Sequence, residues 1–300
     1  MKKTVTIGIP AFNEEANIVH ILDDIFMQKS EGFLLEKVIV ASDKSTDRTD
    51  DLVKSYKNKK VELITSKKRE GQAERQNDIF KKSTSDILVL LNADIKITDP
   101  LFIKKLITPL LFKSIDLTSS FPLPLPATGF IEKILYTSVT MKTNLFESFN
   151  SGQNIYTCHG RARAFSKSLY KKLKFKHSVG EDAYSYMYAL TNGFKYKNVT
   201  NAKIYYKLPA NFADHKNQSA RFIKTKNLLI KSFGQRAVDR EFALPMLLAL
   251  KSMVRAFLKS PFSVLLYVIV FTFLKLGTIK SDSIKNTWDI SASSKKLYEN

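Results

Sequence analysis

The stretch Ser85-Asp-Ile-Leu-Val-Leu-Leu-Asn-Ala-Asp-Ile-Lys-Ile-Thr98 decides how the rest of the chain is interpreted. Its apolar run from Ile87 to Leu91 has the length of a strand and is rich in branched residues, which is typical of a strand buried on both faces. The run ends abruptly in Asn92-Ala93-Asp94. Because ligands of open α/β sheets bind outside the carboxyl ends of the strands, Asp94 is the first candidate functional residue.

Working outward, strand and helix patterns alternate through the first third of the chain. Residues 4–9, 35–40 and 61–64 have the apolar pattern of strands, and residues 17–27, 50–56 and 72–82 have the spacing of helices. This order predicts an α/β fold, with a mixed, mainly parallel sheet covered by helices on both faces. The polar ends of the strands are then expected along one edge.

The second half of the chain begins at a proline-rich passage, Phe121-Pro-Leu-Pro-Leu-Pro126, which favours extended backbone. Beyond it we expect helices at 130–149, 167–173 and 181–190, and a short strand within 158–165. We divide the chain at this seam into residues 1–120 and 121–235. Helices that associate with a membrane follow at 236–280, and a polar tail at 281–300.

Composition limits the class of protein. A chain of 300 residues with 44% hydrophobic content can bury a large core, and the single cysteine, Cys158, forms no internal disulfide, which fits a reducing compartment. The formal net charge of +20 favours a polyanionic partner or surface, such as nucleic acid, anionic lipid or a phosphorylated substrate. Residues 203–259 hold twelve Lys and Arg against three acids, so the basic charge is concentrated toward the C-terminus.

The C-terminal third differs from the rest. In residues 242–258, Lys251 and Arg255 lie four residues apart, with apolar residues around them, as in a helix that lies in a membrane interface. Residues 262–274 form an apolar run that is shorter than the ~18 residues of a clear membrane span. Residues 261–276 could just cross a thin bilayer, and two core helices of a soluble domain are the alternative.

Several carboxylates follow predicted strands or begin predicted helices. Asn92 and Asp94 offer the oxygen ligands that suit Mg²⁺ or Mn²⁺, although an Asp in this place is often only a turn residue. Asp43 can accept hydrogen bonds from a nucleobase or ribose, whereas Asp47 is equally explained as a helix cap.

Two more groups allow both a structural and a functional reading. Glu181-Asp182 behind Gly180 is explained by capping of a helix start, or by a general base whose pKa is raised by its neighbour. Arg221 lies in a polar helix, where it is either solvated or in contact with a diphosphate.

The sequence lacks the motifs of several other classes of enzyme. The four histidines show no metal-binding spacing, and no glycine-rich dinucleotide motif, P-loop or nucleophile elbow occurs. Dehydrogenases, P-loop enzymes and α/β-hydrolases are therefore disfavoured.

The motifs taken in order resemble the family 2 glycosyltransferases of the GT-A fold, over about residues 4–225. The resemblance rests on Ile9-Pro-Ala-Phe-Asn-Glu-Glu15, Ser42-Asp-Lys-Ser-Thr-Asp47, Gly71 with Asn77, Asn92-Ala-Asp94, Gly180-Glu-Asp182 and Gln218-x-x-Arg-Phe222. It implies a donor half that binds a nucleoside-diphosphate sugar with Mg²⁺ or Mn²⁺, and a second half that binds the acceptor.

Residue roles follow from the resemblance alone. Asp182 matches the catalytic base of an inverting single displacement, and Asp94 matches the metal-binding carboxylate. Residues on the acceptor side are Gly160, Glu181 and Phe222. Residues that match donor-binding positions are Pro10, Ala11, Asn13, Glu14, Asp43, Asn77, Asn92, Ala93, Gln218 and Arg221.

The chain departs from the family pattern at four positions. Lys44 replaces a usual Gly, Gln72 a common Lys, Asn92 the first Asp of the metal motif, and Phe222 a usual Trp. An uncharged Asn92 implies weaker or more nucleotide-dependent metal binding. The chain is also too short for the several spanning helices with which large synthases export a polymer.

The leading hypothesis is an inverting, metal-dependent glycosyltransferase on the cytoplasmic face of the cell membrane. Its acceptor is a lipid-linked or cell-surface glycan, its surface partner is anionic lipid, and no nucleic acid is expected. One alternative is a basic nucleic-acid-binding α/β protein, although the charge lies beside apolar helices and not among exposed aromatics. The other alternative is a degenerate transferase that acts as a membrane scaffold, which the departures from the family pattern at Lys44 and Asn92 favour.

Overall fold

The computed structural model describes residues 2–112, 114–176, 180–278 and 297. Within its helices, the side chains of residues 212, 216–223, 270, 271 and 273–278 are not described. Statements about the structure refer to this part of the chain.

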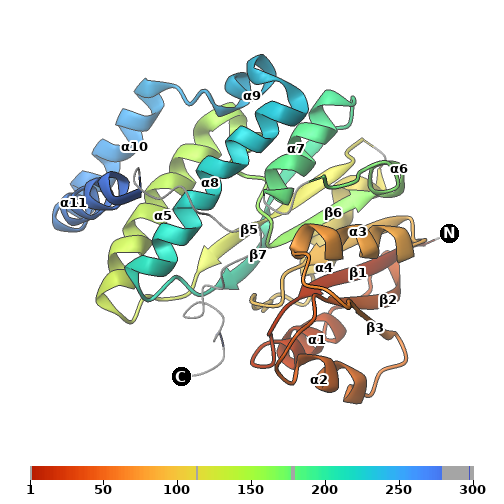
Figure 1. The fold of residues 1–300 in the computed structure, drawn as a ribbon. Coiled ribbons are helices and arrows are strands. Elements are labelled where there is room, and N and C mark those ends of the chain that lie inside the picture. Colours follow the sequence, from red (N-terminus) through yellow and green to blue (C-terminus); the bar gives the residue numbers. More distant parts are fainter. Residues whose placement is uncertain (1, 113, 177–179, 279–296, 298–300) are drawn as a thin grey trace.

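A seven-stranded mixed sheet forms the centre of the described chain, in the order β3-β2-β1-β4-β6-β5-β7 (Figure 1). β6 runs antiparallel to its neighbours β4 and β5, and the other pairings are parallel. The strands are β1 (Lys3–Ala11), β2 (Phe33–Ser42), β3 (Val61–Thr65), β4 (Ile87–Leu91), β5 (Leu117–Pro124), β6 (Ala162–Ser166) and β7 (Tyr196–Tyr206).

Helices cover both faces of this sheet, and a further group extends beyond its β5 and β7 end (Figure 1). The helices are α1 (Ile18–Phe26), α2 (Thr49–Ser55), α3 (Gln72–Lys82), α4 (Phe102–Leu111), α5 (Phe130–Ser148), η1 (Phe149–Gly152), α6 (Lys167–Tyr170), α7 (Glu181–Thr191), α8 (Phe212–Phe233), α9 (Gln235–Phe242), α10 (Met246–Lys259) and α11 (Pro261–Thr278). In the further group, α10 and α11 pack on α5.

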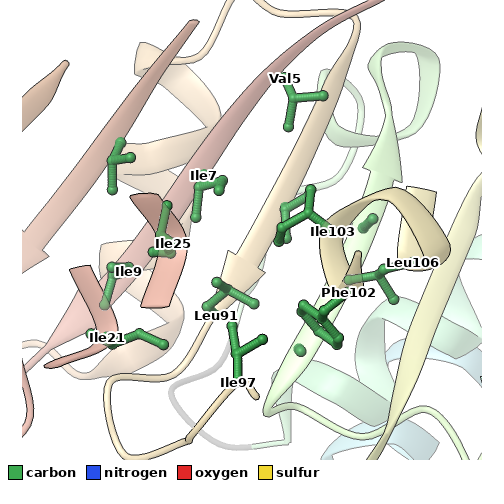
Figure 2. Close-up of a cluster of buried hydrophobic side chains, with 14 of the residues drawn as sticks. Val5, Ile7, Ile9, Ile21, Ile25, Leu91, Ile97, Phe102, Ile103 and Leu106 are labelled. Carbon is green, nitrogen blue, oxygen red and sulfur yellow. The ribbon is translucent and has the colours of Figure 1, made fainter. Parts of the chain in front are cut away.

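Alternation along the strands divides the core into two layers. In β4, Val89 and Leu91 pack with α1 and α4, while Leu88 and Leu90 pack with α3 and α7 on the other face. Figure 2 shows the first layer, where Ile9 of β1 lies beside Ile21 of α1 and Leu91 of β4 lies near Phe102 of α4. On the second face, β1 approaches α3 so closely that a Cβ at Gly8 would lie 2.4 Å from Ile79.

The predicted elements of the first half are confirmed, with β4 and α3 at the expected bounds. β7 was not predicted, since its mixed polar and apolar residues give no clear strand pattern and its pairing with β5 joins segments far apart in the sequence. The helix expected over 242–258 was placed too early. Pro245 precedes α10, because a proline lacks the N–H that a helix interior needs.

The expected seam falls inside β5, and the two halves share one sheet, because β6 of the second half lies between β4 and β5. The expected polar tail at 281–300 lies outside the described residues except for Leu297. None of the helices in the described residues combines the length and hydropathy that crossing a bilayer requires.

Candidate active site

The carboxylate of Asp43, at the end of β2, is buried and holds the loop between β3 and α3. It accepts hydrogen bonds from the backbone N–H groups of Glu70 at 2.9 Å and Gly71 at 2.8 Å. The guanidinium of Arg75 lies 3.5 Å from it. Its side chain is 4% exposed, so it orders this edge of the sheet, and its predicted contact with the base stays a prediction.

A side-chain hydrogen bond connects the start of α3 to the residue that follows β4. Gln72 begins α3, and its Nε2 donates to Oδ1 of Asn92 at 2.9 Å. Two of the departures from the family pattern are therefore in contact with each other. A neutral amide pair stands there, and neither side chain carries a charge into the site.

The loop from Asn92 to Asp94 is held by its backbone. The N–H of Asn92 donates to the carbonyl of Arg161 at 2.9 Å, and Lys96 pairs with Tyr205 of β7. Ala93 is buried in the core. Among the described residues, the half-buried Asp94 carboxylate makes no hydrogen bond or ion pair, so its oxygens are available to a ligand.

A cation at this edge would be held by few protein ligands. No group of three or more His, Cys, Asp or Glu side chains that could hold a metal occurs in the described part of the chain. One carboxylate completed by substrate phosphates is nevertheless a usual arrangement for Mg²⁺. The free oxygens of Asp94 fit a divalent cation of this kind.

Gly160, the residue before Arg161, lies against the start of α7, which carries the predicted base Asp182. A Cβ on Gly160 would lie 3.3 Å from Oδ2 of Asp182 and 3.5 Å from Oε1 of Glu181. The other oxygen, Oδ1 of Asp182, accepts from the N–H of Ala183 at 2.8 Å. The structure therefore brings together the three residues Gly160, Glu181 and Asp182, and Asp182 itself is half-buried.

Replacing Gly160 by Ala is expected to lower kcat about tenfold, because the added methyl group crowds Oδ2 of Asp182. We expect the melting temperature to change by no more than about 2 °C, since this contact is tight but not forbidden. Initial rates and thermal melts measure the two effects. Gly129→Ala is the matched control, because its Cβ would meet only ordinary contacts at 3.7 Å. Full activity of Gly160→Ala contradicts the proposed closeness of Gly160 to the reacting groups.

Two ionisable side chains beside Gly160 are poor proton acceptors or nucleophiles. Burial raises the pKa of the Cys158 thiol to about 12, and its Sγ lies 3.6 Å from the carbonyl oxygen of Asp182. Burial, helped by the charge of Arg161, lowers the pKa of His159 to about 3. Cys158 is therefore a neutral thiol and His159 a neutral imidazole near pH 7, which leaves the carboxylates for proton transfer.

The loop after β1 forms another part of this edge. Pro10 and Ala11 end β1, and the carbonyl of Ala11 accepts from the N–H of Asp43 at 2.8 Å. The amide of Asn13 bonds to Thr46, and the buried Glu14 accepts from Asn17 at 2.8 Å. These bonds join the loop after β1 to the loop after β2.

Backbone geometry explains the preference for Gly at position 44. Lys44 has φ of +61°, in the left-handed region that an L-residue adopts only at a cost of roughly 1–2 kcal/mol. Lys44 retains this conformation without the freedom of a glycine, so the loop after β2 is strained at one residue.

Four other predicted donor or acceptor residues are not placed in the site by the structure. Asn77 is buried, and its amide bonds to the backbone N–H and carbonyl of Phe175, which gives it a structural role. Gln218, Arg221 and Phe222 lie in α8, but their side chains are outside the described residues. Their assignment stays a prediction.

Arg163 of β6 is a residue that sequence reasoning missed. Its side chain is fully buried, and its guanidinium donates to the carbonyl of Glu181 at 2.9 Å, to Ser185 at 2.6 Å and to Gln76 at 3.1 Å. It therefore ties β6 and α3 to the first turn of α7, which carries Asp182. The available signal was the spacing of Arg163 and Phe165, since side chains two residues apart in a strand point to the same face and Phe165 is a core residue.

Residues 6–174, more than half of the chain, match the family model described as Glycosyl transferase family 2. The chain therefore belongs to the family 2 glycosyltransferases and is a glycosyltransferase. No curated protein sequence matches it.

Solved structures agree in fold. The mannosyltransferase PcManGT from Pyrobaculum calidifontis, in complex with GDP-Man and Mn²⁺, is 16% identical with a TM-score of 0.60, over 95% of this chain and 77% of that one. Glucosyl-3-phosphoglycerate synthase from Mycobacterium tuberculosis, in complex with Mn²⁺, UDP and phosphoglyceric acid, is 20% identical with a TM-score of 0.58, over 77% and 79%. At these identities the likeness shows the fold, a GT-A α/β domain.

Proposed function

We propose that the protein is an inverting, metal-dependent glycosyltransferase that moves a sugar from a nucleoside-diphosphate sugar to an acceptor hydroxyl. One observation carries the proposal. Successive contacts connect Asp43, through Gly71, to Gln72 and Asn92, and continue through Arg161 to Gly160 and Asp182. Carboxylates far apart in the sequence thus follow one another along a single edge of the sheet.

Asp182 is the proposed base. Since Oδ1 accepts from Ala183, Oδ2 is the oxygen that can take the proton of the acceptor hydroxyl. The hydroxyl oxygen forms its bond to the anomeric carbon as the bond from that carbon to the diphosphate breaks on the opposite face. The configuration at the anomeric carbon therefore inverts, and the bonding electrons leave with the nucleoside diphosphate.

Asp94 is the proposed cation ligand, with Asn92 as a neutral neighbour that hydrogen-bonds the donor. A bound Mg²⁺ or Mn²⁺ supplies positive charge that stabilises the departing diphosphate. The complexes of the mannosyltransferase and of the glucosyl-3-phosphoglycerate synthase with Mn²⁺ support the choice of a divalent cation. Because Asn92 brings no charge, cation binding is expected to need the phosphates of the donor.

A thermal-shift screen of nucleotide sugars with and without Mn²⁺ tests the donor site. A ligand at about 100 times its Kd stabilises the native state by about 2.7 kcal/mol, so the true donor raises the melting temperature by several degrees. In Asp94→Ala we expect the part of this shift that depends on Mn²⁺ to disappear, with donor affinity about 30-fold weaker. Calorimetric titration measures the affinity directly.

Asp51→Ala is the matched control for Asp94→Ala, because Asp51 is an exposed carboxylate on α2 whose one ion pair within the described part of the chain is with Lys54, at 3.6 Å. It should keep the full shift. An Asp94→Ala variant whose titration with donor and Mn²⁺ is unchanged removes Asp94 from the cation site. Absence of any shift, with every nucleotide sugar, favours the degenerate transferase.

We further propose a lipid-linked or cell-surface glycan as the acceptor, at the cytoplasmic face of the cell membrane. The support is the concentration of basic charge beside apolar helices at 203–259. Radiolabelled transfer from the donor found in the screen to lipid extracts, compared with aqueous glycans, identifies the acceptor class. Transfer to soluble acceptors alone contradicts this part of the proposal.

A further inference from the structure

We propose that the outer faces of α10 and α11 form a lipid-binding surface that inserts into the interface of an anionic bilayer. The inference deepens the proposed membrane location and rests on it, but does not depend on the catalytic assignment. We name this surface the outer face and define it by the large apolar residues that are exposed there: Met246, Leu247, Leu250, Met253, Val254, Phe257, Leu258, Phe262, Leu265, Val268 and Ile269.

The helix α10 is turned the opposite way from a helix of a soluble core. Its small residues face the protein, where Ser252 is buried and donates to the carbonyl of Met141 on α5 at 2.9 Å. Except for the half-buried Leu248, its large apolar residues face outward, and Leu247 is 79% and Leu258 78% exposed. Residues 246, 250, 253 and 257 are spaced by three or four, so they lie along one face.

The helix α11 continues the same surface. Phe262 is 75% exposed, while Val264 and Tyr267 are buried on the opposite side. α11 packs on both α5 and α10. Figure 1 shows α10 and α11 at the outer edge of the molecule, beyond α5 and away from the strands β1 to β3. Exposed apolar residues that gather on two adjacent helices form a larger patch than the single, scattered apolar residues that an ordinary soluble surface exposes.

A basic flank borders the outer face. Lys251, Arg255 and Lys259 follow one another at intervals of four along α10, and all three are exposed. No Asp or Glu occurs in the sequence from residue 242 to residue 281. Cations beside an apolar face match a bilayer that offers hydrocarbon below and anionic headgroups at its surface.

A second copy of the chain fits this surface less well than a bilayer does. Pairing two outer faces would bring together two basic flanks on chains of net charge +20, and like charges repel. An anionic bilayer instead neutralises the flank while it covers the apolar residues. The outer face belongs to helices that follow β5 in the chain and pack on α5, in the half of the chain that is proposed to bind the acceptor. A lipid-linked acceptor would therefore lie on the same side of the molecule as the bilayer.

Site-specific labelling tests the orientation of the bound protein. Cys158 is the only cysteine and is buried, so a new surface cysteine takes a thiol-reactive fluorophore selectively. In Leu247→Cys labelled with an environment-sensitive dye, we expect a blue shift on addition of vesicles of phosphatidylglycerol and phosphatidylcholine. Phe112→Cys, at an equally exposed apolar residue at the end of α4, should show none.

Flotation with the same vesicles measures the contributions of the two parts of the surface. We expect Leu247→Gln with Phe257→Gln to weaken vesicle binding at least about tenfold. Lys251→Gln with Arg255→Gln should weaken binding to anionic vesicles about 30-fold and leave weak binding to phosphatidylcholine alone unchanged. Phe112→Gln is the control and should float like the unmodified chain. Because the replaced side chains are exposed, thermal melts should be unaffected.

Three results overturn the inference: the unmodified chain does not float, both dye positions respond alike, or the chain is a dimer that Leu247→Gln with Phe257→Gln converts to a monomer without any vesicle binding. The last result assigns the outer face to a second copy. A chain that binds its nucleotide sugar but does not float refutes this inference and the membrane location on which it rests, and leaves the proposed catalytic function in place. A chain that floats but binds no nucleotide sugar refutes only the proposed catalytic function.

Discussion

The variant Asp182→Asn is expected to reduce kcat by about 10³-fold or more while donor affinity stays within about twofold. General-base catalysis contributes roughly 10²–10⁴-fold, and an amide cannot take the proton of the acceptor hydroxyl. Asn keeps the shape of Asp and an oxygen that can accept from the N–H of Ala183, so the first turn of α7 should remain in place. Single-turnover transfer measures the rate, and calorimetric titration with donor and Mn²⁺ measures binding.

The competing explanation of Asp182 is a carboxylate that only stabilises the helix start. Asp51→Asn is the control for it, because Asp51 also lies in the first turn of a helix and is exposed. Asp51→Asn should keep full activity. If Asp182→Asn turns over normally and only melts at a lower temperature, the capping role is sufficient and the base must be sought elsewhere.

The second large effect is expected from Arg163→Met, which should destabilise the fold by about 3–5 kcal/mol. Methionine fills much of the space but cannot donate to Gln76, Ser185 and the carbonyl of Glu181, so buried acceptors lose a charged donor. At roughly 2–4 °C for each kcal/mol, the melting temperature should fall by about 10 °C. Activity below the transition should fall too, because the first turn of α7 loses its tie to β6.

Arg161→Met is the matched control, two residues away on the same chain segment. The guanidinium of Arg161 lies 3.7 Å from the centre of the Tyr206 ring and is half-buried, so its loss should cost only about 1 kcal/mol. Equal melting temperatures for Arg161→Met and Arg163→Met would show that the buried hydrogen bonds of Arg163 contribute no more to the stability of the fold than the contact of Arg161 with Tyr206.

Much of the donor half could be predicted because its elements follow local patterns. The apolar run of β4 and the polar helix α3 have signals contained within their own residues, and the structure confirms both. β7 could not be predicted in this way, since its pattern mixes buried and exposed residues and the strand that it pairs with, β5, is far away in the sequence. The strand is stabilised by pairing, and pairing is not visible in a single segment.

The features of the candidate site likewise fall into those that could be predicted from the sequence and those that only the folded structure shows. The order of the motifs was sufficient to select Asp94 and Asp182 and to predict the family, because residue type and spacing are properties of the chain. The contact between Gln72 and Asn92, and the position of Gly160 against Asp182, appear only in the folded molecule. Arg163 was missed because an arginine in a short strand is usually solvated, and only burial shows that its charge is inside.

The sequence by itself determined the alternation of strands and helices, the family and the apolar, basic character of the C-terminal helices, since these depend on residues that are neighbours in the chain. Only the tertiary structure decided which residues share the sheet edge, which way α10 turns its large side chains and what holds the first turn of α7. Those properties depend on contacts between segments that are distant in sequence, and a local pattern carries no information about its partner.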